Sequence, residues 1–337
     1  MPDSAAVIQR SPDAAVAGAA TFAGPVLFFD AASGALLHQA EGHRGGALAL
    51  AFCPQSSLVA TGGQDGQLHL FIPGEQTPSI RLQVGTAPVS GLSWSPDGHV
   101  LAVACGRAVR FYSPAGELLG QWVEHASTVM SLCWSDACAG WLSACYGGVH
   151  VLSRASLQGE RHLFARTSIL TAAPSPCGRY IAGGSQDPIV RIWDLSGGDE
   201  PVHLEGYKGK IATLAWGADS TVLATASGAS VVLWSCAGGD PYQAPHLELP
   251  GHTQRVTALC FLRGGRALLT ASADGRLRLF DLTKSVEPVQ EIDAGTPLHL
   301  IEPLTNGDRV IAAGTDGSLG AWGFSFVIPK VASGRKK

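Results

Sequence analysis

The sequence predicts an all-β protein in which short strands form a closed ring of four-stranded sheets. Glycine supplies 42 of the 337 residues and only 15% are charged, which suits many buried strands joined by tight turns. An apolar run also ends in a bulky residue eight times, at intervals of 40 to 46 residues. These endings are Phe29, Phe71, Tyr112, Leu152, Trp193, Trp234, Phe280 and Trp322. A period of this length indicates repeated units that bury their apolar faces only against neighbouring units.

The seventh repeat shows the predicted strands most clearly. Apolar residues alternate in three short runs between Val256 and Phe280, which indicates three strands. Asp274-Gly275 separates the second run from the third and predicts a tight turn. A fourth, outer strand is expected before the next repeat begins.

Several motifs resemble those of the WD-repeat family of β-propellers. Gly-His pairs precede a predicted strand at Gly42-His43 and Gly251-His252, and Trp193-Asp194 ends a third strand. The resemblance covers essentially the whole chain. It implies a closed β-propeller built of four-stranded blades.

The number of blades depends on where the repeats begin and end. Residues 11–30 align without gaps with residues 175–194, which makes the N-terminal segment a true unit, and residues 324–329 can supply the last outer strand. We therefore favour eight blades, and the alternative is seven blades with a separate N-terminal hairpin. The prediction is one propeller domain over residues 1–329, followed by a basic disordered tail at 330–337. Its units are expected at about 1–41, 42–82, 83–123, 124–162, 163–204, 205–250, 251–292 and 293–329.

The resemblance also implies a buried hydrogen-bonded network within a blade. In the family, this network joins a His before the first strand, a Ser or Thr ending the second, an Asp in the next turn and a Trp in the third strand. The matching residues here are His43, Asp65, Ser185, Asp187, Trp193, His252, Ser272 and Asp274. We interpret these side chains as structural, because they occupy fixed positions in the repeat.

The loops on one face of the ring are the predicted partner-binding surface. The loops before each first strand and the turns between second and third strands gather there, and loops on a rigid scaffold often carry binding residues. By analogy with the family, and because Arg and Tyr are enriched at binding hot spots, certain loop residues are expected to face a partner. These are Arg44, Gln64, Arg107, Gln186, Tyr207, Lys210 and Arg255. The turns at 106–107, 147–148 and 228–229 are shorter and lack Asp, which marks departures from the repeat.

No catalytic or metal-binding pattern stands out in the sequence. Phosphate-binding, dinucleotide-binding and nucleophile-elbow motifs are missing. Cys133, Cys138, Cys145 and His150 are close in sequence, but their spacing differs from that of zinc sites, so no metal and no cofactor is expected. We expect a non-catalytic protein–protein interaction scaffold that binds a protein or peptide. The alternative is a propeller enzyme, or a protein that binds a small ligand or metal in the central channel.

Charge and segment composition bear on partners and location. A net charge of −4 with 23 basic residues provides no broad positive field, so neither nucleic acid nor a membrane is an expected partner. The first ten residues lack a basic and apolar leader pattern, and the eight cysteines are scattered without a CxxC pair. The protein is therefore expected in the cytoplasm, bound to a protein or peptide or acting as a subunit of a larger complex.

Overall fold

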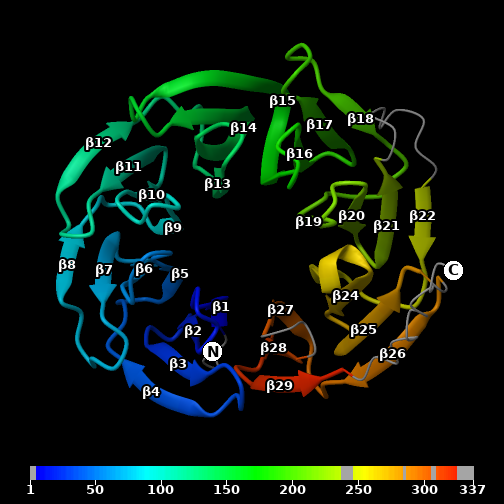
Figure 1. Cartoon of the computed structure of the whole chain (residues 1–337), viewed down its shortest axis with the longest axis horizontal. Coiled ribbons are helices and arrows are strands. Elements are labelled where there is room, and N and C mark those ends of the chain that lie inside the picture. Colours follow the sequence, from blue (N-terminus) through cyan, green and yellow to red (C-terminus); the bar gives the residue numbers. More distant parts are fainter. Residues whose placement is uncertain (1–4, 237–245, 284–285, 305–308, 325–337) are drawn as a thin grey trace, which may run out of the picture.

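The structure is a computed structural model that describes residues 5–236, 246–283, 286–304 and 309–324. The tail predicted at 330–337 lies outside these residues, as does almost all of the outer strand predicted at 324–329. The sheets are arranged around a central opening, with their first strands inside and, in the four-stranded sheets, their fourth strands at the rim (Figure 1). Within the described residues, no helix is long and apolar enough to span a membrane.

The first three sheets each contain four antiparallel strands in chain order. The first sheet has β1 (Ala5–Arg10), β2 (Val16–Thr21), β3 (Val26–Asp30) and β4 (Leu36–Ala40). The second has β5 (Ala47–Phe52), β6 (Val59–Gly63), β7 (Gln67–Phe71) and β8 (Ile80–Gln83). The third has β9 (Val89–Trp94), β10 (Leu101–Cys105), β11 (Ala108–Tyr112) and β12 (Leu118–Trp122).

The remaining sheets differ in their number of strands. A six-stranded sheet has β13 (Ser131–Ser135), β14 (Gly140–Ser153), β15 (Gly159–Pro174), β16 (Tyr180–Ser185), β17 (Val190–Asp194) and β18 (Val202–Leu204). Two four-stranded sheets follow, with β19 (Thr213–Trp216), β20 (Val222–Ser227), β21 (Ser230–Ser235) and β22 (His246–Leu249), then β23 (Val256–Leu262), β24 (Ala267–Ser272), β25 (Arg276–Asp281) and β26 (Pro288–Asp293). The last sheet has three described strands, β27 (Leu298–Pro303), β28 (Arg309–Gly314) and β29 (Leu319–Gly323), and a 3-10 turn, η2 (Arg263–Gly265), joins β23 to β24.

The described strands form seven hydrogen-bonded sheets, so the prediction of eight separate blades is wrong and the alternative number of seven applies. The unit boundary expected between residues 162 and 163 falls inside β15, which continues without a break from Gly159 to Pro174. One end of β15 pairs with β14 and the other end pairs with β16. The strands of the two expected units, 124–162 and 163–204, therefore share one sheet. Within that sheet β14 itself reverses at Gly147 and Gly148, which both have positive φ angles.

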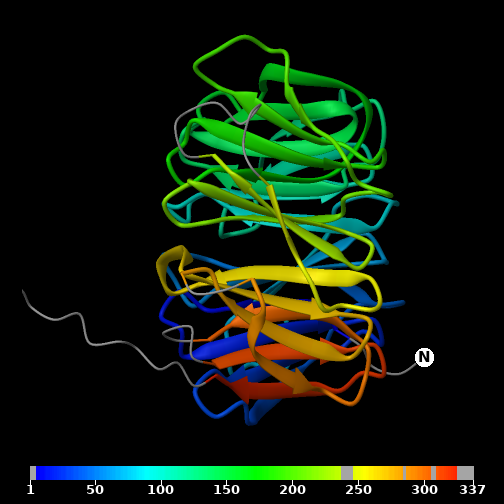
Figure 2. The same cartoon turned by 90° about the vertical axis from the view of Figure 1, so that its right-hand side faces the viewer.

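The N-terminal segment is a full blade and not a separate hairpin, because β1 to β4 pair in order. Ala17 and Phe29 pack in one apolar cluster with Leu304, Ile311 and other residues of the last sheet. Figure 2 shows the first sheet, in blue, beside the last sheet, in orange and red. This packing closes the ring.

The apolar core lies between neighbouring sheets. Leu68 and Leu70 of the second sheet are fully buried in one cluster with Leu101 of the third. At Gly62 the sheets come so close that an added Cβ would lie 2.3 Å from a methyl group of Val89. Each sheet therefore buries its faces against its neighbours, as the repeat predicted.

Inner-strand tryptophans add hydrogen bonds to this packing. The Trp94 indole donates to the Ala51 carbonyl at 3.2 Å, and Trp216 donates to the Ala173 carbonyl at 3.1 Å. Trp122 lies on an outer strand, where its ring packs over Gly159 and is only partly exposed. Its position gives it a packing role.

Candidate functional site

A buried network in the second sheet joins His43 to the turn between β6 and β7. His43 Nδ1 lies 3.0 Å from Asp65 Oδ1, and Nε2 lies 2.9 Å from Thr61 Oγ1. Burial lowers the pKa of His43, so the ring is neutral near pH 7. Because a carboxylate only accepts hydrogen bonds, Nδ1 donates to Asp65 and the Thr61 hydroxyl donates to Nε2. Every polar atom of the ring is thus occupied.

The same arrangement recurs in the sheet formed by β23 to β26. His252 Nδ1 lies 3.0 Å from Asp274 Oδ2, and Nε2 lies 2.7 Å from Thr270 Oγ1. Arg278 also pairs with Asp274 at 3.0 Å. The structure therefore brings His252 and Asp274 together but not Ser272, whose hydroxyl donates instead to the Gln254 carbonyl.

The fifth predicted unit has the network residues in a different arrangement. Arg191 donates to Asp187 and to the Ser185 hydroxyl, and its hydrogen bond to Asp187 is the main cause of that carboxyl's lowered pKa. The Trp193 ring is fully buried, but its Nε1 has no hydrogen-bond partner among the described residues. Gly183 occupies the position of Thr61 and Thr270, and a Cβ there would lie 2.8 Å from the Trp193 ring. Trp193 therefore fills the space of the missing hydroxyl side chain.

Tyr207 belongs to a network of this kind and is partly buried, while its assignment to a partner remains a prediction. Its hydroxyl lies 2.6 Å from Thr225 Oγ1 and accepts a 2.6 Å hydrogen bond from the Trp234 indole. Burial raises the pKa of Tyr207 to about 12. Tyr207 thus replaces the histidine of the other networks.

A fourth network centres on His125, which the sequence patterns did not select. Its Nε2 lies 2.7 Å from the Ser143 hydroxyl, and its Nδ1 lies 3.0 Å from the Arg107 carbonyl. In all four networks the ring residue precedes its hydroxyl partner by 18 residues. This constant spacing is the signal that would have found His125, Tyr207 and the correct hydroxyl residues.

The predicted loop residues lie at the same end of the strands, where backbone hydrogen bonds join turns to neighbouring loops. The backbone N–H of Gln64 donates to the Gly46 carbonyl, and the backbone N–H of Gln186 donates to the Ser168 carbonyl. The side chains of Arg44, Gln64, Gln186, Lys210 and Arg255 are exposed. Their assignment to a partner remains a prediction.

Arg107 lies on the same face in the turn between β10 and β11. It is exposed, and its Nε donates to the His125 carbonyl at 2.8 Å. This bond holds the guanidinium end of the side chain beside the loop that contains His125. A role of Arg107 in partner binding remains a prediction as well.

A cleft of about 430 Å³ opens on this face between the sheets β19–β22 and β23–β26. Lys210 and Arg255 line it, and each directly precedes a buried residue: Ile211, two residues before β19, and Val256, the first residue of β23. The backbone holds both positions, since Ile211 N donates to the Ser185 carbonyl and Val256 N donates to the Gly228 carbonyl. Neither cation forms an ion pair with any residue that the structure describes. This cleft is the candidate binding site.

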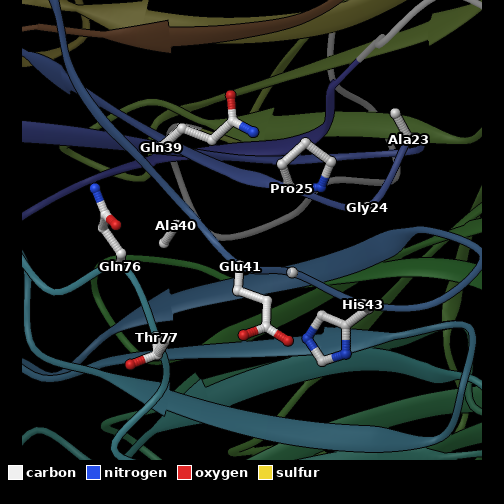
Figure 3. A pocket seen from close by; sticks show the side chains of 10 residues that line it. Ala23, Gly24, Pro25, Gln39, Ala40, Glu41, His43, Gln76 and Thr77 are labelled. Carbon is white, nitrogen blue, oxygen red and sulfur yellow. The ribbon is translucent and has the colours of Figure 1, made fainter.

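A larger hollow of about 540 Å³ lies between the first and second sheets. Figure 3 shows Glu41 and His43 side by side on one stretch of chain there, with Gln39 and Gln76 also at its wall. Glu41 pairs with Arg81 at 2.5 Å, and His43 is held by Asp65. Its ionisable groups already have partners, so we do not select it as the site.

Histidine side chains also meet at the six-stranded sheet. The His150 and His162 rings stack with centroids 4.1 Å apart, and His125 approaches His150 edge to face at 5.0 Å. Burial, together with the two neighbouring imidazoles, lowers the pKa of His150 to about 4. Across the described part of the chain, no three His, Cys, Asp or Glu side chains are grouped so as to hold a metal ion.

Comparisons with known proteins agree with the repeated architecture. The family model "WD domain, G-beta repeat" matches residues 157–194, 198–235 and 243–281, and the model "Anaphase-promoting complex subunit 4 WD40 domain" matches residues 50–137. The solved structure of Sqt1 from Chaetomium thermophilum superposes with a TM-score of 0.82 at 17% identity, covering 96% of this chain and 97% of that one. The computationally designed Ika8 protein gives a TM-score of 0.80 at 18% identity, with the same coverage of 96% and 97%. At this identity the structural likeness concerns the fold alone.

Curated relatives are longer than the segments they share with this chain. The pre-mRNA-splicing factor cwf17 of Schizosaccharomyces pombe is 29% identical over 164 residues, which are 48% of this chain and 47% of that protein. Human coronin-7 is 29% identical over 250 residues, which are 72% of this chain but 23% of that protein. The two family models together match more than half of the sequence, and the chain belongs to the WD-repeat family.

Proposed function

We propose that this protein is a non-catalytic scaffold that binds a partner protein or peptide on its loop-rich face. The observation that carries the proposal is the cleft between β19–β22 and β23–β26, where Lys210 and Arg255 are exposed without an ion pair to a described residue. By contrast, Arg276 and Arg278 of β25 are paired with carboxylates of their own sheet. Unpaired charges on a fixed backbone are available to a partner of complementary charge.

Two further observations support this proposal. Membership of the WD-repeat family supplies a rigid ring on which loops from several blades meet, and such loops commonly carry binding residues. The relatives are longer than the segment they share with this chain, and one of them is named as a pre-mRNA-splicing factor. Neither relative identifies the partner of this chain.

Site-specific photo-crosslinking tests which face binds. A crosslinking amino acid placed at Gln64 or Gln186 is expected to capture a partner in extracts of the source cells, because both side chains are exposed on the loop-rich face. The matched control is His99, which is exposed in the turn between β9 and β10, at the opposite end of the strands. Equal capture from His99, or capture from His99 alone, would contradict the proposed face.

We also propose a cytoplasmic location. All eight cysteines are free thiols, which suits a reducing compartment. Fractionation of the source cells with antibodies against this chain tests the proposal. Recovery only with a membrane or secreted fraction would contradict it.

A further inference from the structure

The cleft at Lys210 and Arg255 contains several hydrogen-bond donors and no acidic side chain. Its other polar walls are Thr213, Thr257 and His299. The Thr257 hydroxyl lies 3.0 Å from the Leu298 carbonyl, whereas the Thr213 hydroxyl forms no hydrogen bond with the residues that the structure describes. Two cations and a free hydroxyl therefore face one space.

Two acidic residues lie in a separate hollow beside the cleft. Glu205 and Glu248 line a space of about 390 Å³ that shares Gly228 with the cleft and contains Lys208. Lys208 is thus the cation closer to these carboxylates, although no ion pair joins it to a described residue. The lining of the cleft contains no carboxylate that would neutralise the positive charges of Lys210 and Arg255.

The short turn between β20 and β21 explains why the cleft is open. Ser227 pairs directly with Ser230, so two residues, Gly228 and Ala229, make the turn. The corresponding turn between β24 and β25 spans residues 273–275 and carries Asp274, which neutralises Arg278. The turn of the sheet β19–β22 is therefore one residue shorter than that of β23–β26 and lacks its carboxylate.

We propose that the cleft receives a carboxylate side chain from an acidic linear segment of the partner protein. Arg255 and Lys210 would pair with the carboxylate, and the Thr213 hydroxyl would donate a hydrogen bond to it. The inference rests on the proposed function, and it names the chemistry of the partner. A cleft of about 430 Å³ has room for one or a few side chains, which suits an extended segment.

A polyanion such as nucleic acid fits these observations less well. Binding of a phosphate backbone needs a continuous basic track, whereas the chain carries a net charge of −4 and the neighbouring hollow is acidic. The two cations form one local site. A short acidic peptide needs only this local site.

Selection from a displayed library of random linear peptides tests the inference on the full chain. Peptides recovered on the wild-type protein are expected to be enriched in Asp and Glu. Lys210→Glu combined with Arg255→Glu should weaken a selected peptide about tenfold or more in fluorescence anisotropy. The matched control, Lys208→Glu, changes an exposed lysine of the same loop and should leave affinity almost unchanged.

The outcomes separate this inference from the proposed function. Affinity that falls as salt rises from about 0.05 to 0.5 M, with Asp and Glu enrichment on wild type only, supports the acidic segment. Peptides that bind without acidic residues, and equally to the double variant, would overturn the inference while the scaffold function stands. Tighter binding of a labelled single-stranded RNA than of the selected peptides would also overturn it. Recovery of no peptide would contradict it too, and the crosslinking experiment would then decide the scaffold function.

Discussion

Asp274 offers a direct test of the structural reading of the networks. Its carboxylate accepts hydrogen bonds from the Thr253 and Arg276 amides, each at 3.0 Å, and lies 3.0 Å from both His252 Nδ1 and Arg278. Its side chain is only 5% exposed. Although burial alone would raise the pKa of Asp274, the hydrogen bonds from Thr253, His252 and Arg278 hold it well below its ordinary value. The carboxylate is therefore charged and satisfied throughout the neutral range.

Asp274→Ala should lower the free energy of unfolding by about 3 kcal/mol. Removing one partner of a buried pair typically costs about 3 to 5 kcal/mol, because the remaining charge stays buried without compensation. The lower end is expected here, since Glu291 still lies 2.7 Å from Arg278 Nε. The variant should keep its partner binding at temperatures where it is folded.

Urea denaturation, followed by tryptophan fluorescence, measures this loss. Asp316→Ala is the matched control, because Asp316 is the turn aspartate between β28 and β29 but is exposed, and its carboxylate accepts hydrogen bonds from the Ser318 amide and hydroxyl rather than from a buried His or Arg. Its replacement should change stability much less. An unchanged unfolding free energy in Asp274→Ala, or an equal loss in Asp316→Ala, would refute the reasoning.

The acid limb of the stability curve provides a second measurement on the same variant. A carboxyl whose pKa is lowered on folding stabilises the folded state above its unfolded value of 3.8, and this contribution is lost as pH falls through the folded pKa. Asp274→Ala should therefore lose less stability than wild type when pH falls below about 4. A parallel decline in both proteins would show that Asp274 is not held in its charged form by folding.

Three further predictions concern groups with unusual partners. Trp234→Phe should cost about 1 to 2 kcal/mol more than Trp193→Phe in denaturant, because only the Trp234 indole loses a hydrogen bond, and equal costs would contradict this. Burial lowers the pKa of His150 to about 4, so the free energy of unfolding of wild type should fall by about 1 to 2 kcal/mol as pH falls from 6.5 towards 4. His150→Phe should reduce that fall when unfolding is measured as a function of pH. Burial raises the pKa of Glu302 from 4.5 to about 7, so its contribution to stability should fall as pH rises through this window. Glu302→Gln should remove that fall, and a melting curve with unchanged pH dependence would contradict the assignment.

The repeat predicted the strands well because it follows directly from side-chain alternation. Phe71 and Tyr112 each end a third strand, and Asp274-Gly275 lies in a turn, as expected. The blade count was wrong because sheet membership depends on backbone hydrogen bonds. Nothing in the residues around 162 shows that β15 continues to pair on both sides of the expected boundary.

The network hydroxyls show a second limit of sequence reasoning. Thr270 and Ser272 are two residues apart on β24, so their side chains point to the same face of the sheet. The alternation of side chains therefore cannot identify the hydroxyl that binds His252. The position of the His252 ring decides it, and the ring contacts Thr270. Tyr207 was missed for a different reason, since the family pattern specifies histidine at that position while a phenol can reach Thr225 as well.

The candidate site arises where the network loses its acidic member. In β23–β26, Asp274, Glu291 and Asp293 surround Arg276 and Arg278, so these cations are neutralised within the sheet. In β19–β22, Tyr207 completes the network with uncharged partners, and no aspartate is needed in the turn. A neutral network is satisfied without attracting nearby lysine or arginine side chains. Cations at the adjacent loop positions then remain exposed, so the departure from the repeat that preserves the fold also creates a surface charged for a partner.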